Sequence, residues 1–294
     1  MSRKGWIFLI LTLALMSFGL CRALLKREPV PTLPAEAKER EALRRFWDSY
    51  REAGRKRSAG QFAEAISFYQ QALALRPDHE DSLYYLGNCY FELARYSSAI
   101  ENYQRLVAVN PKGSSRGYMQ LGLIYASLEP GAPLDLAKAS EYFEQTLAVD
   151  PDSGALLGRG EVAILQGKWE QAWKLLKEAN ADNAMSVAAP FLLGYLCDRK
   201  GQSKEAWQWF RLAVQRGEMK KLPVKWTEEG DLKADPELRW KALAKQSVFG
   251  QLWLPVRKYL KAPDFSAADM KQEYQRVDEA LARAARVLRE AKRG

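Results

Sequence analysis

The sequence predicts an all-α fold in which pairs of helices stack into a solenoid. Three observations support this prediction. Small and aromatic residues recur through the middle of the chain with a period of about 34 residues, as in repeats built from two helices. A proline closes each of the first three copies. Beyond the repeats, apolar residues recur at alternating steps of four and three, which predicts a helix with one apolar face.

Composition and charge limit the classes of function. The chain has 294 residues, of which 47% are apolar, so it can form a substantial core. Its net charge of +9 is divided unequally: residues 1–57 carry +7, residues 58–218 carry −4 and residues 219–294 carry +6. Nucleic-acid binding through the repeats would need a basic middle region, so it is the less favoured alternative. The basic ends suit an anionic membrane surface or an acidic partner better.

Residues 1–27 are predicted to be a signal peptide or an N-terminal membrane anchor. An uncharged run of 17 residues, at 5–21, follows Arg3 and Lys4. This length is at the lower limit for a spanning helix and slightly long for a signal-peptide core. An uncleaved anchor is favoured, followed by a cleaved signal and then by acylation of Cys21. The short basic start favours an extracytoplasmic body, tethered by the anchor or secreted after cleavage. Arg22, Lys26 and Arg27 follow the run and weaken this preference, so the orientation stays open.

Residues 28–45 are predicted to be a linker that leads into the first helix. Three prolines lie between Glu28 and Pro34. Proline disfavours helix and favours extended backbone, so this stretch predicts a short, stiff spacer. Such a spacer would hold the rest of the chain away from a membrane surface.

Five copies of the repeat can be aligned on their alanines, which are Ala65, Ala99, Ala139, Ala172 and Ala206. The steps between them are 34, 40, 33 and 34 residues. The longest step contains a loop rich in proline and glycine, Leu128–Leu136. We therefore divide residues 46–218 into five repeats, which are 46–79, 80–113, 114–152, 153–186 and 187–218.

The second copy carries Gly87, Tyr96, Ala99, Tyr103 and Pro111 in this order. This pattern resembles the tetratricopeptide repeat, and the resemblance covers somewhat over half of the chain. It implies a right-handed superhelical solenoid of about five helix pairs. Small residues let the two helices of a pair approach closely, and the aromatic rings fill the volume between pairs.

The resemblance also implies that the first helices of the repeats line a concave groove that binds a protein or a peptide. Matching the pattern residue by residue gives the groove candidates, which are Trp47, Tyr50, Arg57, Tyr84, Asn88, Phe91, Glu92, Arg116, Met119, Glu161, Phe191, Tyr195, Asp198 and Arg199. Aromatic side chains mixed with both charge signs suit a peptide with apolar anchors and a few charges. The alternative for each residue is that it shields a helix end or faces solvent.

Residues 219–263 depart from the repeat and are predicted to cap it. Four aromatic residues here, Trp226, Trp240, Phe249 and Trp253, are too apolar to face solvent. An exposed last repeat needs a cover, so we expect them to pack on it. The stretch that begins at Asp235 reads as the start of a helix.

Residues 264–294 are predicted to form an amphipathic helix. Ser266 and Asp269 have the spacing of a capping box. The apolar stripe that follows consists of Met270, Tyr274, Val277, Leu281, Ala284 and Leu288. We expect this helix to pack back on the repeats; self-association or partner binding through 266–292 is the alternative.

No residue pattern indicates catalysis, a cofactor, a metal or a small-molecule substrate. The single histidine, His79, lies in a predicted turn, where we expect a solvated loop residue. Cys89 and Cys197 fall within first helices and are predicted to be buried and unpaired. The sequence therefore favours a non-enzymatic adaptor at a membrane, which binds a protein or a peptide and acts in the assembly of an envelope complex.

Overall fold

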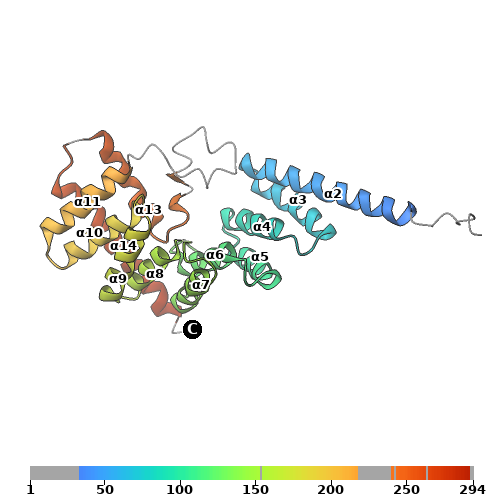
Figure 1. Ribbon diagram of the computed structural model, residues 1–294. Coiled ribbons are helices and arrows are strands. Elements are labelled where there is room, and N and C mark those ends of the chain that lie inside the picture. Colours follow the sequence, from blue (N-terminus) through green and yellow to red (C-terminus); the bar gives the residue numbers. More distant parts are fainter. Residues whose placement is uncertain (1–32, 153, 218–239, 242, 263, 292–294) are drawn as a thin grey trace, which may run out of the picture. The chain divides into compact units, whose positions relative to one another are not determined.

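The structure is a computed structural model, and it describes residues 33–152, 154–217, 240–241, 243–262 and 264–291 (Figure 1). Within this part of the chain, all regular secondary structure is α-helix or 3₁₀-helix. Two compact units are present, residues 1–48 and residues 49–294. The predicted membrane segment, the predicted helix start at Asp235 and Trp226 lie outside the described residues. None of the helices that the structure does describe is both long enough and apolar enough to cross a membrane.

The first helix, α2 (Leu33–Ser58), begins in one unit and ends in the other. The helices of the repeats follow it, and they are α3 (Phe62–Leu75), α4 (Glu80–Glu92), α5 (Tyr96–Val109), α6 (Ser115–Ala126), α7 (Leu136–Val149), α8 (Ala155–Leu165), α9 (Trp169–Asp182), α10 (Ala188–Arg199) and α11 (Ser203–Gly217). The C-terminal part contains α13 (Gly250–Trp253), the 3₁₀-helix η3 (Leu254–Lys261) and α14 (Ala267–Ala291).

These helices form a stack of pairs, as predicted. The two members of each pair contact each other in α4–α5, α6–α7, α8–α9 and α10–α11. Neighbouring pairs are joined by contacts of α3 with α4, α5 with α6, α7 with α8 and α9 with α10. Helices α4 to α10 thus each pack against both their own partner and the adjacent pair, which is how stacked repeats share a core.

The predicted small and large residues meet in this core. A β-carbon added at Gly87 would lie 2.6 Å from the ring of Tyr103, so only glycine leaves room for that ring. The ring of Phe143 is enclosed in the same way by Gly122 and Gly158. The repeated alanines are all completely buried, which confirms their role at the helix contacts; they are Ala65, Ala99, Ala139, Ala172 and Ala206.

Prolines end the second helices of the first three repeats. Helices α3, α5 and α7 end two residues before Pro77, Pro111 and Pro151, respectively. A residue that precedes proline is disfavoured in helical conformation, and this explains where the helices stop. The long loop before α7 ends at Asp135, whose side chain accepts hydrogen bonds from the amides of Ala137 and Lys138, both at 3.1 Å.

Short turns between the two helices of a pair use the left-handed backbone region. Gly60, Gly167 and Gly201 have φ angles of 73°, 71° and 74°. Ala94 stands at the matching place in the second repeat and has φ of 54°. Alanine is strained in this region because its β-carbon approaches the backbone, whereas glycine is not.

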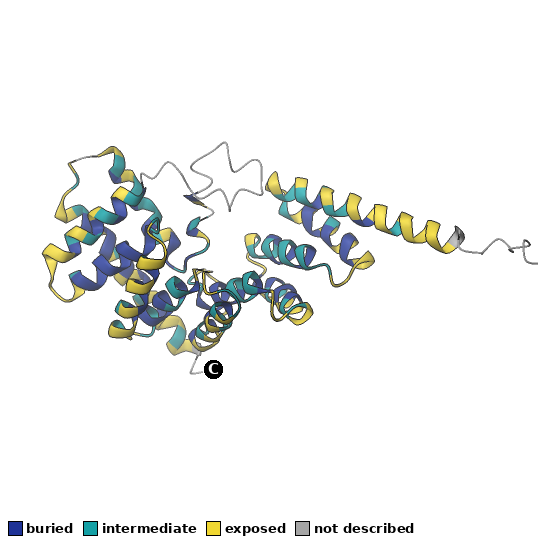
Figure 2. Ribbon diagram, viewed as in Figure 1, coloured by how far each residue is buried: buried dark blue, intermediate teal, exposed yellow. Residues whose placement is uncertain are grey.

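The C-terminal segment, defined as residues 243–262 and 264–291, packs on the last repeats together with Trp240. Trp240, Phe249 and Trp253 are buried in one cluster with Phe191 and Phe210, so the predicted cover is present in the described residues. Figure 2 shows α10 buried along most of its length. A helix that is apolar on all sides is expected where packing occurs on both of its faces.

Helix α14 begins with the predicted capping box. The amide and the hydroxyl of Ser266 donate to Asp269 Oδ2 at 2.7 and 2.8 Å, and the Asp269 amide donates back to Ser266 Oγ at 3.4 Å. The helix lies beside α8, α11 and α13 (Figure 1). Met270, Tyr274 and Val277 are buried, so the apolar stripe packs within the chain, as expected.

Candidate functional site

The first-helix face is defined here by the fourteen predicted groove residues, each of which lies on the first helix of a pair. Trp47 belongs to the unit of residues 1–48, where its ring is 4.9 Å from that of Phe46 and 41% of its surface is exposed. The remaining thirteen belong to the unit of residues 49–294. They fall into a group on α2, α4 and α6 and a group on α8 and α10, and these two groups have different surroundings.

At the end of α2, aromatic rings and a guanidinium group lie together. The guanidinium of Arg57 lies 4.2 Å from the ring centroid of Tyr85, and its Nε donates to the Tyr69 hydroxyl at 3.3 Å. The ring of Tyr50 lies 5.1 Å from that of His79. Burial, helped by the negative charge of Asp81, raises the pKa of Tyr50 to about 12, so its hydroxyl is neutral at pH 7.

A second cluster joins α4 to α6. Arg116 pairs with Asp81, and its guanidinium lies 4.6 Å from the ring centroid of Tyr84. Burial is the largest single influence on the pKa of Arg116 and lowers it. The hydrogen bond to Asp81 and the charge of Asp81 together outweigh burial, so the pKa is raised. Asp81 and Tyr85 were not predicted as site residues. Asp81 lies on α4 within one turn of Tyr84, and this spacing is the signal that could have identified it.

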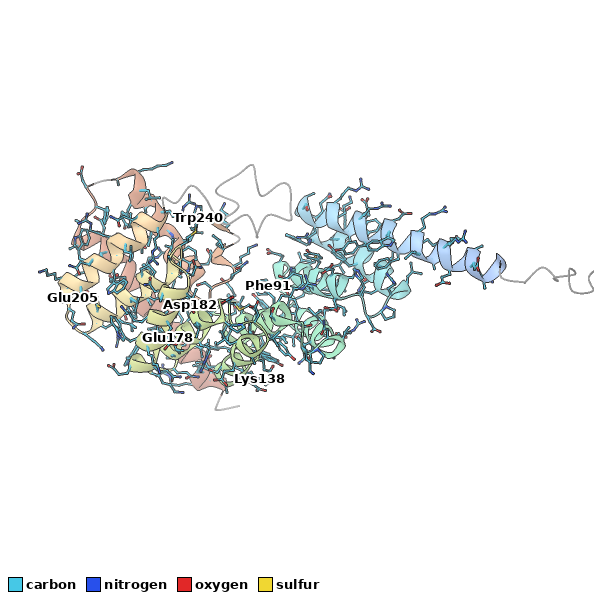
Figure 3. The ribbon with its side chains drawn as sticks, viewed as in Figure 1. Phe91, Lys138, Glu178, Asp182, Glu205 and Trp240 are labelled. Carbon is cyan, nitrogen blue, oxygen red and sulfur yellow. The ribbon has the colours of Figure 1, made fainter. Side chains whose placement is uncertain are left out.

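Three other residues of this group lie farther along the same helices. Asn88 accepts a hydrogen bond from the hydroxyl of Tyr103 at 2.6 Å, which fixes its amide. Phe91, labelled in Figure 3, lies near the end of α4 and is half-buried. Met119 on α6 is also half-buried and lines a cavity. The α2, α4 and α6 part of the face thus offers aromatic, amide and charged groups at the surface.

Glu161 on α8 lies under the C-terminal segment. It is completely buried, and it accepts hydrogen bonds from the hydroxyl of Ser247 and from the amides of Val248 at 2.8 Å and Phe249 at 3.3 Å. Burial raises the pKa of Glu161 to about 7, while these three hydrogen bonds act in the opposite direction. The carboxylate therefore binds the chain's own backbone in this structure.

The α10 residues are covered by α14. Tyr195 donates a hydrogen bond to Asp278 at 2.6 Å, and Arg199 pairs with the same carboxylate at 3.1 Å. The ring of Phe191 lies 5.4 Å from that of Tyr274. Both Phe191 and Tyr195 are buried, so they do not form an open surface here.

Asp198 is half-buried on the same helix. Burial first, and the charge of Asp198 second, raise the pKa of the Tyr274 hydroxyl. The five predicted residues on α8 and α10 thus contact, or lie beside, the C-terminal segment. One ion pair also ties this segment to the other group: Lys245 Nζ lies 2.5 Å from Glu92 on α4.

The structure corrects one prediction outside the face. His79 was expected to be a solvated loop residue, but it is the N-cap of α4. Its Nδ1 accepts a hydrogen bond from the Ser82 amide at 3.2 Å, and burial lowers the pKa of the ring. Cys89 and Cys197 are buried free thiols, as predicted. Among the described residues, no group of histidine, cysteine or carboxylate side chains is arranged to hold a metal ion.

Family models described as tetratricopeptide repeats match residues 56–120, 134–184 and 166–218. Together these matches cover about half of the chain. Comparison with curated proteins gives no significant match to this sequence.

Several solved structures have a similar fold. PilF from Pseudomonas aeruginosa is 13% identical with a TM-score of 0.53, over 85% of this chain and 99% of that one. PilW, described as a type IV pilus biogenesis factor, is 20% identical with a TM-score of 0.52, over 79% and 97%. MamA from Desulfovibrio magneticus RS-1 is 15% identical with a TM-score of 0.52, over 60% and 98%. At these identities the likeness shows the fold alone.

Proposed function

Because the chain belongs to the tetratricopeptide repeat family, we propose that it is a scaffold that binds a protein partner on α4, α6 and the end of α2. The observation that carries this proposal is the difference between the two parts of the first-helix face. On α8 and α10 the chain's own C-terminal segment fills the positions that the sequence assigned to a partner. On α4 and α6, Tyr84, Phe91 and Met119 remain half-buried at the surface.

The chemistry of this second part suits a polypeptide. Half-buried aromatic rings supply apolar contact area at low cost in side-chain entropy. Arg57 and Arg116 are held in place by stacking on tyrosine rings, and Arg116 also pairs with Asp81. A carboxylate or backbone carbonyl of a partner would share or replace the Asp81 contact of this positioned guanidinium. A protein segment with a few apolar anchors and acidic groups matches this combination.

We further propose that residues 5–21 tether this scaffold to a membrane, with the repeats on the extracytoplasmic side. Release after cleavage of the signal is the alternative. The uncharged run after Arg3 and Lys4 supports the tether. A role in assembling an envelope complex is consistent with the tether and with the similar fold of a pilus biogenesis factor.

Site-specific photo-crosslinking in cells tests the binding proposal. A photoreactive phenylalanine analogue is placed at Phe91, or at Phe191 as the matched control, in the full chain. We expect a discrete adduct with another protein from position 91 that is lost when Tyr84→Ala and Arg116→Ala are added. From position 191 we expect only a crosslink within the chain, because Tyr274 lies over it.

Adducts from both positions with the same partner, or none from position 91, would contradict the proposed face. Recovery of nucleic acid from position 91 would favour the alternative function. Fractionation of the full chain and of a chain without residues 1–34 tests the tether separately. Equal release of both chains into the soluble fraction would count against a retained anchor.

A further inference from the structure

A cavity lies at one end of the proposed binding face. Its volume is about 290 Å³, and its walls come from the ends of α8, α9 and α10, from Met119 on α6 and from the C-terminal segment. This volume is near the lower end of ligand pockets and fits one large side chain or two small ones. Because Met119 is also a residue of the first-helix face, a chain that lies on α4 and α6 would reach the cavity directly.

The interior of the cavity is mainly apolar. Leu157, Val187, Ala188, Leu243 and Trp253 line it, and Val187, Ala188 and Trp253 are buried. The indole nitrogen of Trp253 donates to the Ser247 hydroxyl at 2.9 Å, so this polar group is satisfied within the wall. An apolar side chain that enters would exchange water contact for these surfaces.

The rim of the cavity is acidic. Asp152 and Asp182 line it and are exposed; Asp182 lies at the C-terminal end of α9 (Figure 3). No lysine or arginine is among the described residues that line the cavity. The nearby guanidinium of Arg216 donates to the Asn180 side chain at 2.7 Å and to the Ser186 carbonyl at 3.0 Å. The rim thus favours a cation beside the apolar opening.

We propose that this cavity anchors a bulky apolar side chain of the protein partner, next to a lysine or arginine that pairs with Asp152 and Asp182. The proposal rests on the proposed function and names one feature of the partner. The C-terminal segment has a direct part in it, since Leu243 and Trp253 form one wall. That segment therefore shapes the partner site as well as covering α8 and α10.

Methionine methyl NMR on the full chain in detergent micelles tests the proposal. Met119 and Met185 line the cavity, and Met270 is buried in α14 as an internal control. The probe is the peptide acetyl-Gly-Phe-Lys-Gly-amide, with Phe→Ala and Lys→Glu peptides as comparisons. We expect the first peptide to shift the methyl signals of Met119 and Met185. The Met270 signal should change only weakly. The Phe→Ala peptide should give no shift, and the Lys→Glu peptide should bind about fivefold more weakly.

The double variant Asp152→Asn with Asp182→Asn should bind the first peptide and its Lys→Glu form with equal affinity. The matched control changes two exposed carboxylates away from the cavity, Glu101→Gln on α5 with Glu205→Gln on α11, and should keep the preference. Failure of Met119 and Met185 to respond would mean that the cavity does not bind an apolar side chain beside a cation, and would overturn the proposal. A preference that survives the double rim change would overturn the assigned role of the aspartates. Either result leaves the crosslinking test at Phe91 unaffected.

Discussion

The hydroxyl of Tyr274 on α14 occupies the space that a β-carbon at Gly194 on α10 would need. Helix α14 can therefore sit in this place only because position 194 has no side chain. We predict that Gly194→Ala displaces Tyr274 and lowers the free energy of unfolding by about 1–3 kcal/mol, as in other overpacked cores. Urea denaturation measures the loss, and hydrogen exchange should show weaker amide protection in α14.

The Tyr274 hydroxyl is buried and has no hydrogen-bond partner among the described residues. Tyr274→Phe is consequently expected to change stability by less than about 1 kcal/mol, and to restore part of the loss in Gly194→Ala. Restoration stays partial because the added β-carbon also lies 3.1 Å from the Ala206 carbonyl oxygen. Additive effects of the two changes would show that the residues are not in contact.

Ala94 provides a prediction about the turns. It has φ of 54° where the first, fourth and fifth repeats have glycine. Ala94→Gly should therefore relieve backbone strain and stabilise the protein by about 0.5–1 kcal/mol, after allowing for the greater freedom of glycine in the unfolded chain. Thermal unfolding measures the gain.

Gly60→Ala is the matched control for this change. A β-carbon at Gly60 meets no atom within 4 Å, so any effect there comes from the backbone conformation alone. We expect destabilisation of about 1 kcal/mol, opposite in sign to the effect at Ala94. If both changes shift stability in the same direction, backbone strain is not the cause.

The helix pairs and their core could be predicted because they depend on local spacing. Gly87 and Tyr103 are 16 positions apart, and their contact follows once two antiparallel helices are assumed. The aromatic residues of 219–263 and the apolar stripe of 264–294 predicted that a cover exists. Its individual contacts with α8 and α10 could not be predicted. Glu161 meets Val248 across 87 positions, and Tyr195 meets Asp278 across 83, so no periodic pattern links them.

One local signal that the cover lies on the predicted groove face of α10 was nevertheless present. The first ten residues of α10, Ala188–Cys197, are all buried, and none of them is charged. A first helix with an open groove face should carry polar residues on that face, as α4 does with Asn88 and Glu92. The all-apolar composition indicates packing on both sides. His79 was misjudged for a different reason: histidine is an uncommon N-cap, so its sequence position gave no indication of that role.

The buried carboxyl of Glu161 predicts an unusual pH dependence. Its pKa is raised by burial from 4.5 to about 7 in the folded chain, so the folded state binds this proton more tightly than the unfolded state. Its contribution to stability is therefore greatest below pH 4.5 and is lost as the pH rises to 7. The loss amounts to about 3 kcal/mol. Glu161→Gln should flatten this slope in urea denaturation between pH 5 and pH 8.

Glu273 on α14 predicts the opposite slope. It is buried and accepts hydrogen bonds from Lys258, Tyr259 and Arg276 at 2.6, 2.9 and 2.7 Å. Burial alone would raise its pKa, but these hydrogen bonds lower it below 4.5. Its contribution is therefore present above pH 4.5 and is lost as the pH falls. Glu273→Gln should cost about 1.5–3 kcal/mol at pH 7 and less at pH 4. An equal cost at both values would contradict this account.

Asp278 connects the C-terminal segment to the face that it covers. It accepts a hydrogen bond from Tyr195 and pairs with Arg199, so Asp278→Asn should weaken both contacts at once. The pair is partly exposed, and we expect a loss of about 1 kcal/mol in the free energy of unfolding. The effect should be local, with faster hydrogen exchange in α14. Glu279→Gln, the exposed neighbour whose carboxylate accepts only from Gln275 among the described residues, should leave exchange unchanged. Helix α14 contacts α8 and α11, so faster exchange should stay near these helices. Faster exchange throughout α4 and α6 in Asp278→Asn would show instead that the two parts of the face are coupled.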